Sequence, residues 1–189
     1  SGSLSTQFLC SEFMRPVMQA TALWKIYASG ESTVQAVRGV DVEVKEGEMI
    51  AIMGPSGCGK TTLLNVLSGI DEPNSGEVLI DGSPMYSVSD DKRTQMRAEN
   101  LGFIFQDFNL LPVLSAVENV ELPLLLLGKS ASESRKSALE ALDSVGLADR
   151  SEHRPTELSG GQQQSVAIAR AIVHPPKVIL CDEPTGNLD

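Results

Sequence analysis

An eight-residue segment in the first third of the chain has the residue types and spacing to bind phosphate. It reads Gly54-Pro55-Ser56-Gly57-Cys58-Gly59-Lys60-Thr61, which matches the pattern G-x-x-x-x-G-K-[ST] in full. Its glycines let the backbone curl so that several N–H groups point to one place, and the helix expected after it adds partial positive charge there. We expect Lys60 to reach the β- and γ-phosphates of a nucleotide and Thr61 to offer a hydroxyl to Mg²⁺. The alternative is a glycine-rich turn with a surface lysine.

A pair of acidic residues, Asp182 and Glu183, directly follows the apolar run Val178–Cys181. In an open parallel sheet, ligands bind at the carboxyl ends of the strands, so we expect these acids to emerge beside the glycine-rich loop. Asp182 can hold Mg²⁺ through water, and Glu183 can orient or deprotonate an attacking water. A solvated strand end is the alternative, because apolar strands often end in acids.

A second helix start has the sequence Leu158-Ser159-Gly160-Gly161-Gln162. Ser159 suits the N-cap, and Gln162 three residues later completes a capping box. The two glycines leave backbone N–H groups uncovered, which makes a second potential anion site, although a well-capped helix explains the pattern equally well. Two phosphate-seeking helix ends in one chain favour an arrangement in which two copies pair and each loop faces the other copy's Ser159 helix.

The elements that position these residues alternate between strand and helix patterns. Strands are predicted over Thr21–Tyr27, Val34–Val44, Met49–Met53, Glu77–Ile80, Leu101–Phe105 and Val178–Cys181. Helices are predicted from Lys60 to Ser68, from a capping box at Ser130 and Glu133 to Gly146, and from Ser159 to Val173. The alternation predicts a mostly parallel α/β sheet, and the helical stretch 107–154 reads as an insertion into it.

Composition narrows the class of protein. The chain has 189 residues, with 15 Lys and Arg against 25 Asp and Glu. The resulting net charge of −10 argues against broad binding to nucleic acid, although a local site can still bind a nucleotide. The three cysteines (Cys10, Cys58 and Cys181) lack metal-ligand spacing and favour a reducing compartment. The most apolar stretch, Val120–Leu127, contains an acid and a proline and is too short for a membrane helix.

Together, the loop at 54–61, the Leu158–Gln162 sequence and Asp182-Glu183 resemble the nucleotide-binding domain of an ATP-binding-cassette (ABC) transporter, from about residue 18 to the end. The resemblance implies a P-loop NTPase core with a mostly parallel sheet, an antiparallel β subdomain and an inserted helical subdomain. It divides the chain into a tail at 1–16, partly derived from cloning, a core with the β subdomain at 17–106, a helical subdomain at 107–157, and the signature helix, Walker B strand and D-loop at 158–189.

The resemblance also implies an ATPase with ATP and Mg²⁺ as cofactors, and it assigns site residues. The catalytic residues that it implies are Glu183, Lys60 and Gln106. The residues that it implies bind Mg²⁺ are Thr61, Gln106 and Asp182. Nucleotide contacts fall to Tyr27, Gly54, Pro55, Ser56, Gly57, Cys58, Gly59, Lys60, Thr61, Thr62, Ser159, Gly160, Gly161 and Gln162. Tyr27 lies where the family stacks an aromatic ring on adenine, with Trp24 a weaker candidate, while a core tyrosine at a strand end is the alternative. Gly186–Asp189 resembles the D-loop, which crosses the dimer interface.

The implied partners are a second ABC ATPase subunit, in an ATP-dependent homodimer, and a separate transmembrane permease. The chain would energise this permease from the cytoplasmic face of the membrane, bound peripherally. The segment after Gln106 would contact the permease through Phe108, Leu110 and Leu111, unless these side chains are ordinary core. The stretches Phe108–Pro112 and Glu118–Leu124 resemble the ATPases of lipoprotein release and macrolide export, and no nucleic-acid partner is expected. The transported compound is chosen by the permease.

Two departures from the family pattern carry alternatives. Ser165 stands where the family usually has an arginine, which would weaken the dimer or the packing of the signature helix. The family histidine that contacts the γ-phosphate has no counterpart, and His153 and His174 are expected at the surface. A truncated module that binds ATP and hydrolyses it poorly is therefore the alternative function, with strand 178–181 as an exposed edge if nothing follows Asp189. Another phosphate-loop enzyme, such as a kinase or a DNA-repair ATPase, is a third interpretation.

Overall fold

The computed structural model describes residues 16–29 and 32–183. In chain order its elements are β1 (Pro16–Ser29), β2 (Ser32–Lys45), α1 (Lys60–Leu67), β3 (Ser75–Ile80), β4 (Ser83–Pro84), α2 (Asp90–Asn100), β5 (Leu101–Ile104), α3 (Ala116–Leu126), α4 (Ala131–Ser144), η1 (Ala148–Arg150), η2 (Pro155–Glu157), α5 (Gly160–Ile172) and β6 (Val178–Cys181). The predicted D-loop, Gly186–Asp189, and all of the predicted tail except residue 16 lie outside the described residues.

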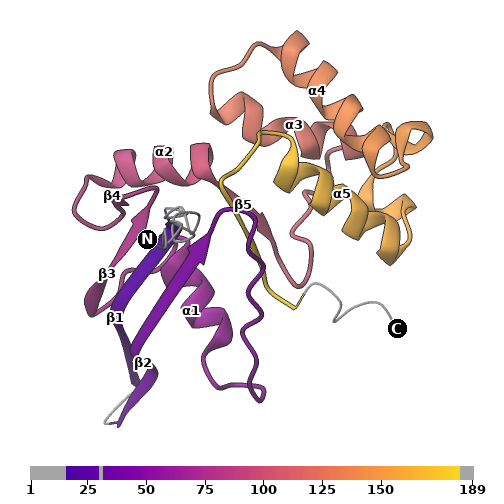
Figure 1. The fold of residues 1–189 in the computed structure, drawn as a ribbon. Coiled ribbons are helices and arrows are strands. Elements are labelled where there is room, and N and C mark those ends of the chain that lie inside the picture. The colour runs from indigo at the N-terminus through magenta and orange to yellow at the C-terminus, as the bar shows by residue number, and fades with distance from the viewer. Residues whose placement is uncertain (1–15, 30–31, 184–189) are drawn as a thin grey trace, which may run out of the picture.

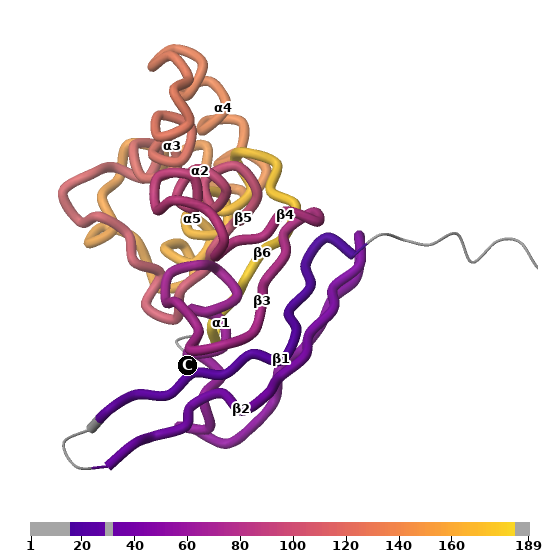
Figure 2. The backbone as a smooth tube through the Cα atoms, turned by 90° about the vertical axis from the view of Figure 1, so that its left-hand side faces the viewer, coloured from indigo at the N-terminus to yellow at the C-terminus, as the bar shows by residue number. Residues whose placement is uncertain are grey.

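A four-stranded antiparallel sheet, in the order β2-β1-β3-β4, forms one side of the molecule. β1 and β2 run side by side as a long ribbon, in which Tyr27 pairs with Val34 near one end and Met18 pairs with Val44 near the other (Figure 2). β3 pairs with β1 over the half that begins at Met18. The strands predicted at 21–27 and 34–44 are confirmed as the inner parts of β1 and β2, and this sheet is the expected antiparallel subdomain.

β5 and β6 form a separate parallel pair, in which Leu101 lies opposite Val178 and Ile104 opposite Cys181. Both predicted strands are confirmed, although β5 ends one residue earlier than expected. β5 lies close to α5, because a Cβ atom on Gly102 would come within 2.5 Å of the Ala171 carbonyl oxygen. A side chain at this position would push the parallel pair away from the helix.

The strand predicted at Met49–Met53 does not form. The segment pairs with no strand among the described residues, and its side chains are exposed, with Met49 at 93% and Met53 at 87%. A continuous apolar run predicts burial on both faces of a sheet, but it does not say which neighbour supplies the hydrogen bonds. Without such a neighbour among the described residues, the run leads into the glycine-rich loop with its side chains exposed.

Apolar side chains form two separate cores. One lies between the four-stranded sheet, α1 and the β5–β6 pair, and includes Met18, Leu23, Leu67 and Val78. The other lies within the lobe of α3, α4 and α5, which stands apart from the long β ribbon in Figure 1. The predicted capping box that begins α4 is confirmed, because Ser130 accepts from the Glu133 backbone N–H and the Glu133 side chain accepts from the Ser130 backbone N–H.

Helix α2 was not predicted, although its ends carry ordinary helix signals. Ser89 caps its start, Asp90 and Asp91 lie in its first turn, and Arg97 lies in its last turn, which suits the helix dipole. Only Met96 of this helix is buried, so an apolar stripe could not reveal it.

The expectation that both histidines lie at the surface is wrong for His174, which is 6% exposed. Its Nε2 lies 3.1 Å from the Leu101 carbonyl oxygen, at the start of β5. The residue follows the end of α5, where the helix packs on β5, so tertiary contacts bury a residue that looks like a polar helix end in the sequence. His153 is half-buried.

Candidate phosphate-binding site

The glycine-rich loop ends where α1 begins, and the last glycine is required by its surroundings. Gly59 is the N-cap of α1 and has a left-handed backbone, with φ of 102°. A Cβ atom there would come within 2.2 Å of the Ala36 carbonyl oxygen on β2. Gly57 also has a positive φ, of 79°, but faces open space. The glycine pattern therefore allows the loop to turn tightly and to press against the ribbon at the same time.

The Lys60 ammonium lies across this loop. Its Nζ donates to the Gly54 carbonyl at 2.7 Å and to the Pro55 carbonyl at 3.1 Å. The start of α1 has no side-chain cap and no acidic residue in its first turn. An ammonium group and uncapped backbone N–H groups therefore gather where a phosphate can accept hydrogen bonds from both.

The structure brings Thr61 and Asp182 together, although 121 positions separate them in the chain. Thr61 Oγ1 donates to the Asp182 carboxylate, at 2.9 Å from Oδ2 and 3.3 Å from Oδ1. Asp182 is placed there because it follows β6, and its backbone N–H donates to the Ile104 carbonyl on β5 at 2.9 Å. A hydroxyl and a carboxylate in contact offer the oxygen donors that Mg²⁺ prefers, so these residues fit that ion. Glu183, the next residue, is exposed and has a left-handed backbone with φ of 42°.

Tyr27 stands near the end of β1 with 39% of its surface exposed, so it is not a core residue. Its hydroxyl donates to Asp71 Oδ2 at 2.5 Å. Burial is the largest cause that raises the pKa of this phenol; the bond to Asp71 adds to it, and a hydrogen bond with the Thr62 side chain opposes it. Tyr27 is thereby placed beside the first turn of α1. Trp24, the weaker candidate, is 37% exposed and packs where a Cβ atom on Gly39 would lie 3.3 Å from its indole nitrogen.

The Ser159 helix start has the predicted capping box. The Gln162 backbone N–H donates to Ser159 Oγ at 3.3 Å, and the Ser159 N–H donates to Gln162 Oε1 at 3.0 Å. Gly161 has no atom near the position of a Cβ. Ser165 Oγ donates to the Gly161 carbonyl at 3.1 Å, so this hydroxyl closes a bond within its own helix. In Figure 1, α5 begins at its lower right end, well apart from α1, and its other end leads toward β6.

Gln106 is exposed and comes two residues after the end of β5. The segment that follows it contains two successive residues with positive φ, Phe108 at 59° and Asn109 at 46°. Arg170 of α5 donates to both of their carbonyls, at 2.6 Å and 2.7 Å. Sequence reasoning missed this arginine, because nothing in its helix pattern shows that it reaches a loop 61 positions away.

The three apolar residues after Gln106 separate in the structure. Phe108 is buried at 6% exposure and Leu110 packs on the core of the helical lobe, whereas Leu111 is 46% exposed and the nearby Val113 is 73% exposed. The interpretation of these residues as ordinary core therefore holds for Phe108 and not for Leu111.

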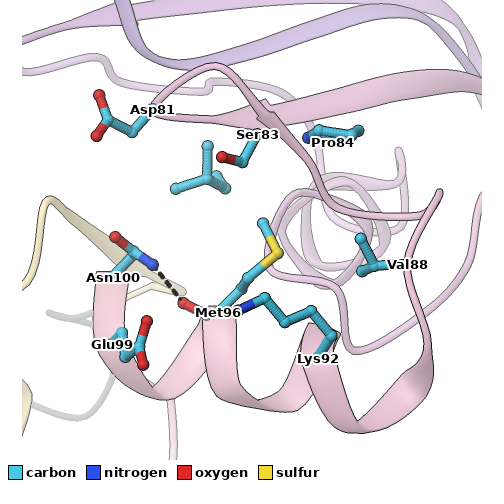
Figure 3. Close-up of a pocket in the computed structure, with 9 residues that line it drawn as sticks. Asp81, Ser83, Pro84, Val88, Lys92, Met96, Glu99 and Asn100 are labelled. Atoms are coloured by element: carbon cyan, nitrogen blue, oxygen red, sulfur yellow. Dashed lines mark hydrogen bonds between the residues drawn. The ribbon is translucent and has the colours of Figure 1, made fainter.

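A hollow of about 400 Å³ lies elsewhere, between the β3–β4 turn and α2. Asp81, Lys92, Met96 and Asn100 are among the residues that line it, and the Asn100 amide donates back to the Met96 carbonyl (Figure 3). None of the predicted site residues lines this hollow.

The described part of the chain contains no helix with the length and apolar content needed to cross a bilayer.

The chain matches the family model described as ABC transporter over residues 37–186. It is 53% identical over 176 residues to an uncharacterized ABC transporter ATP-binding protein of Thermotoga maritima, which covers 93% of this chain and 75% of the relative. It is 47% identical over 174 residues to the lipoprotein-releasing system ATP-binding protein LolD of Saccharophagus degradans, covering 92% and 76%. A solved dimer of the ATP-binding cassette MJ0796 in a post-hydrolysis state, bound to ADP and Pi, superimposes with a TM-score of 0.84 at 46% identity, covering 91% of this chain and 76% of that one.

Proposed function

Because this chain belongs to the ABC transporter family and is an ATP-binding subunit with ATPase function, we propose that it binds Mg²⁺–ATP along the loop at 54–61, hydrolyses it as a homodimer and energises a membrane permease. The contact between Thr61 and Asp182 is the observation that supports this proposal most directly, because it unites the loop with the acids at the end of β6. A phosphate-binding loop without these acids could bind a nucleotide but would lack the groups for hydrolysis.

The proposed roles follow from the positions of the side chains. Lys60 leaves the Gly54 and Pro55 carbonyls and donates to the β- and γ-phosphates, where it offsets the charge that develops during transfer. Glu183 accepts a hydrogen bond from the water that attacks the γ-phosphate, and Gln106 orients the same water. Thr61, Asp182 and Gln106 would hold Mg²⁺, which, when bound, neutralises charge on the phosphate oxygens.

The second copy supplies the other half of the proposed site. In one chain the Ser159 helix start is exposed and lies away from the loop. The backbone N–H groups of the exposed residues Gly160 and Gly161 can donate hydrogen bonds to the γ-phosphate of a nucleotide held by the partner's loop. A dimer of this kind gives a role to both helix starts of each chain, because the start of α1 binds the phosphates of one nucleotide and the start of α5 binds those of the partner's nucleotide.

For the permease contact, we propose the exposed side chains Leu111 and Val113 rather than the buried Phe108. They lie five and seven positions after Gln106 in the same segment, so movement of the permease can change the position of this glutamine. The LolD relatives support a transporter of the lipoprotein-release or exporter group. The chain would then lie at the cytoplasmic face of the membrane, held there by the permease.

Glu183→Gln tests the proposed chemistry. This change keeps the shape of the side chain and removes its capacity to act as a base, so we expect ATP binding to persist while turnover falls by about a hundredfold or more. Sedimentation in the presence of Mg²⁺–ATP should show dimers of this variant, because the nucleotide is trapped between two copies. Glu77→Gln, an exposed change on β3, is the control and should leave turnover unchanged. Full turnover in Glu183→Gln, or only monomers with ATP, would contradict the proposed site.

A further inference from the structure

We propose that Lys25 and Asp71 are positioning residues that fix the Tyr27 ring relative to the phosphate loop, so that the chain recognises the base of its nucleotide as well as the phosphates. The proposal rests on the proposed function, ATP binding at the loop 54–61, and on the expectation from the family resemblance that Tyr27 stacks on adenine. It gives a role to Lys25 and Asp71, which take no part in the proposed hydrolysis of ATP.

The two oxygens of the Asp71 carboxylate are engaged by different partners. Oδ2 accepts from the Tyr27 hydroxyl at 2.5 Å, and Oδ1 accepts from Lys25 Nζ at 2.6 Å. The same ammonium also donates to the Glu72 carbonyl at 2.7 Å, and the Lys25 side chain is only 13% exposed. Because both oxygens are held from different directions, the carboxylate cannot rotate freely, and the phenol that it binds is held with it.

Asp71 is itself fixed to the end of α1. Its backbone N–H donates to the Asn65 carbonyl at 3.1 Å, and its carbonyl accepts from the hydroxyl of the half-buried Tyr86 at 2.7 Å. The other end of the same helix begins at Lys60 and Thr61. An eight-residue helix is a stiff rod of about 12 Å, so Asp71 ties the aromatic ring to the element that carries the phosphate-binding groups.

The lysine also covers one face of the ring. Lys25 Nζ lies 5.0 Å from the centroid of the Tyr27 ring, within the range of a cation–π contact. The exposed part of the ring therefore remains available for a base on the opposite face. A ring that is already held in place loses little conformational freedom when the base stacks, and this preorganisation strengthens binding without any new contact to the nucleotide.

The charges that hold the ring persist at neutral pH. Burial works to raise the pKa of the Asp71 carboxyl, but the hydrogen bonds from Lys25 and Tyr27 outweigh it and lower the pKa overall. The carboxylate is therefore ionised whenever the protein works near neutrality.

The test compares two ligands that share their phosphates and differ in the base. Affinities for Mg²⁺–ATP and for inorganic tripolyphosphate are measured by calorimetry on the 189-residue chain and its variants. We expect Tyr27→Ala to weaken ATP binding by about tenfold, because it removes the stacked ring, and to leave tripolyphosphate binding unchanged. Asp71→Ala and Lys25→Met should each weaken ATP binding by about threefold to tenfold, again without an effect on tripolyphosphate. Asp71→Asn keeps an acceptor for the Tyr27 hydroxyl and should recover part of the loss.

The controls separate positioning from folding. Asp81→Ala removes a comparable aspartate that pairs with Lys177 away from the loop, and it should change neither affinity. Tyr27→Phe keeps the ring but loses the bond to Asp71, so it should weaken ATP binding as Asp71→Ala does, and the double variant should show no additional loss. If Asp71→Ala does not fold, Tyr27→Phe and Lys25→Met provide the same comparison.

The possible results have distinct meanings. An ATP-specific loss in Tyr27→Ala, Asp71→Ala and Lys25→Met supports the proposal. A loss in Tyr27→Ala with unchanged affinities in Tyr27→Phe, Asp71→Ala and Lys25→Met overturns the positioning role and leaves adenine stacking intact. Unchanged ATP affinity in Tyr27→Ala overturns stacking itself, and equal losses for ATP and tripolyphosphate in Asp71→Ala mean that Asp71 only maintains the loop.

Discussion

The starts of α1 and α5 are the two helix ends that we propose bind phosphate, and their backbone N–H groups are capped differently. α1 follows a left-handed glycine and has no side-chain cap, and Lys60 folds back over the loop. α5 follows Ser159, which forms a complete capping box with Gln162. The first helix end offers its backbone N–H groups together with the Lys60 ammonium, whereas the capping box of the second already uses the N–H groups of Ser159 and Gln162, so fewer N–H groups are left there for a ligand.

Because of this difference, we assign the start of α1 to ATP binding by a single chain and the start of α5 to ATP-dependent pairing of two copies. The uncapped end of α1, with a cation and the Thr61–Asp182 contact beside it, can hold the triphosphate in a single chain. The capped end of α5 gains little from an anion alone, so its contribution should appear when a second copy brings a nucleotide to it.

Gly59→Ala should be the most damaging change at the α1 end. A methyl group would overlap the Ala36 carbonyl oxygen, and the left-handed backbone disfavours any Cβ. We expect the free energy of unfolding to fall by about 3 kcal/mol and ATP binding to be lost, as measured by urea denaturation and calorimetry. Gly57→Ala has a similar φ in open space and should cost clearly less. Equal losses in the two variants would mean that the contact with β2 does not matter.

Lys60→Ala should weaken ATP binding by about a hundredfold, because a charge-assisted hydrogen bond contributes about 3 kcal/mol at most. Stability should change little, since the ammonium binds only exposed loop carbonyls. Calorimetric titration with Mg²⁺–ATP measures the loss, and Lys177→Ala, which removes a lysine at the Asp81 pair, is the control. An unchanged affinity would show that the loop does not receive the phosphates.

Ser159→Ala should cost about 1 kcal/mol of stability through loss of the cap. ATP affinity of the single chain should stay the same, while ATP-dependent dimerisation should weaken. Ser130→Ala removes a matched capping box on α4 and should cost similar stability with no effect on dimers. If Ser159→Ala reduced ATP binding by the isolated chain, the assignment of the α5 start to dimerisation alone would be wrong.

Gly161→Ala should raise stability by roughly 0.5 kcal/mol, because alanine has a higher helix propensity and the added methyl group meets open space. Thermal unfolding without nucleotide measures this gain. Dimerisation with ATP should become weaker in the same variant, since the methyl group occupies the space through which a partner's phosphate would approach. A gain in both properties would argue against an anion site at this helix start.

The smallest expected effect concerns the other end of α5 and depends on pH. Burial is the main cause that lowers the pKa of His174 below its ordinary value of 6.5, and repulsion from Lys129 adds to this, against the hydrogen bond at the Leu101 carbonyl. The unfolded chain therefore binds the proton more readily, so the contribution to stability is fully present above pH 6.5 and is lost as the pH falls below that value through the lower pKa of the folded state. His174→Gln should flatten this part of the stability profile in urea denaturation, and His153→Gln should leave it in place.

Local sequence signals predicted several elements and both helix ends correctly. The pattern at 54–61, the apolar run before Asp182 and the capping boxes at Ser130 and Ser159 depend on residues close together in the chain, so spacing alone is informative. The weak apolar pattern of α2 hid that helix, although Ser89 and the two aspartates after it marked its start.

Other features were decided only in three dimensions. Residue types and their spacing were enough to predict a phosphate-binding turn between a run of apolar residues and a helix, because glycine, lysine and threonine act through backbone geometry and charge at short range. The packing of distant segments leaves Met49–Met53 without a paired neighbour in the described part of the chain and buries His174. It also brings Asp71 to Tyr27 and Arg170 to the loop after Gln106. Burial and long-range hydrogen bonds depend on which segments pack together, and no local pattern of residue types specifies that choice.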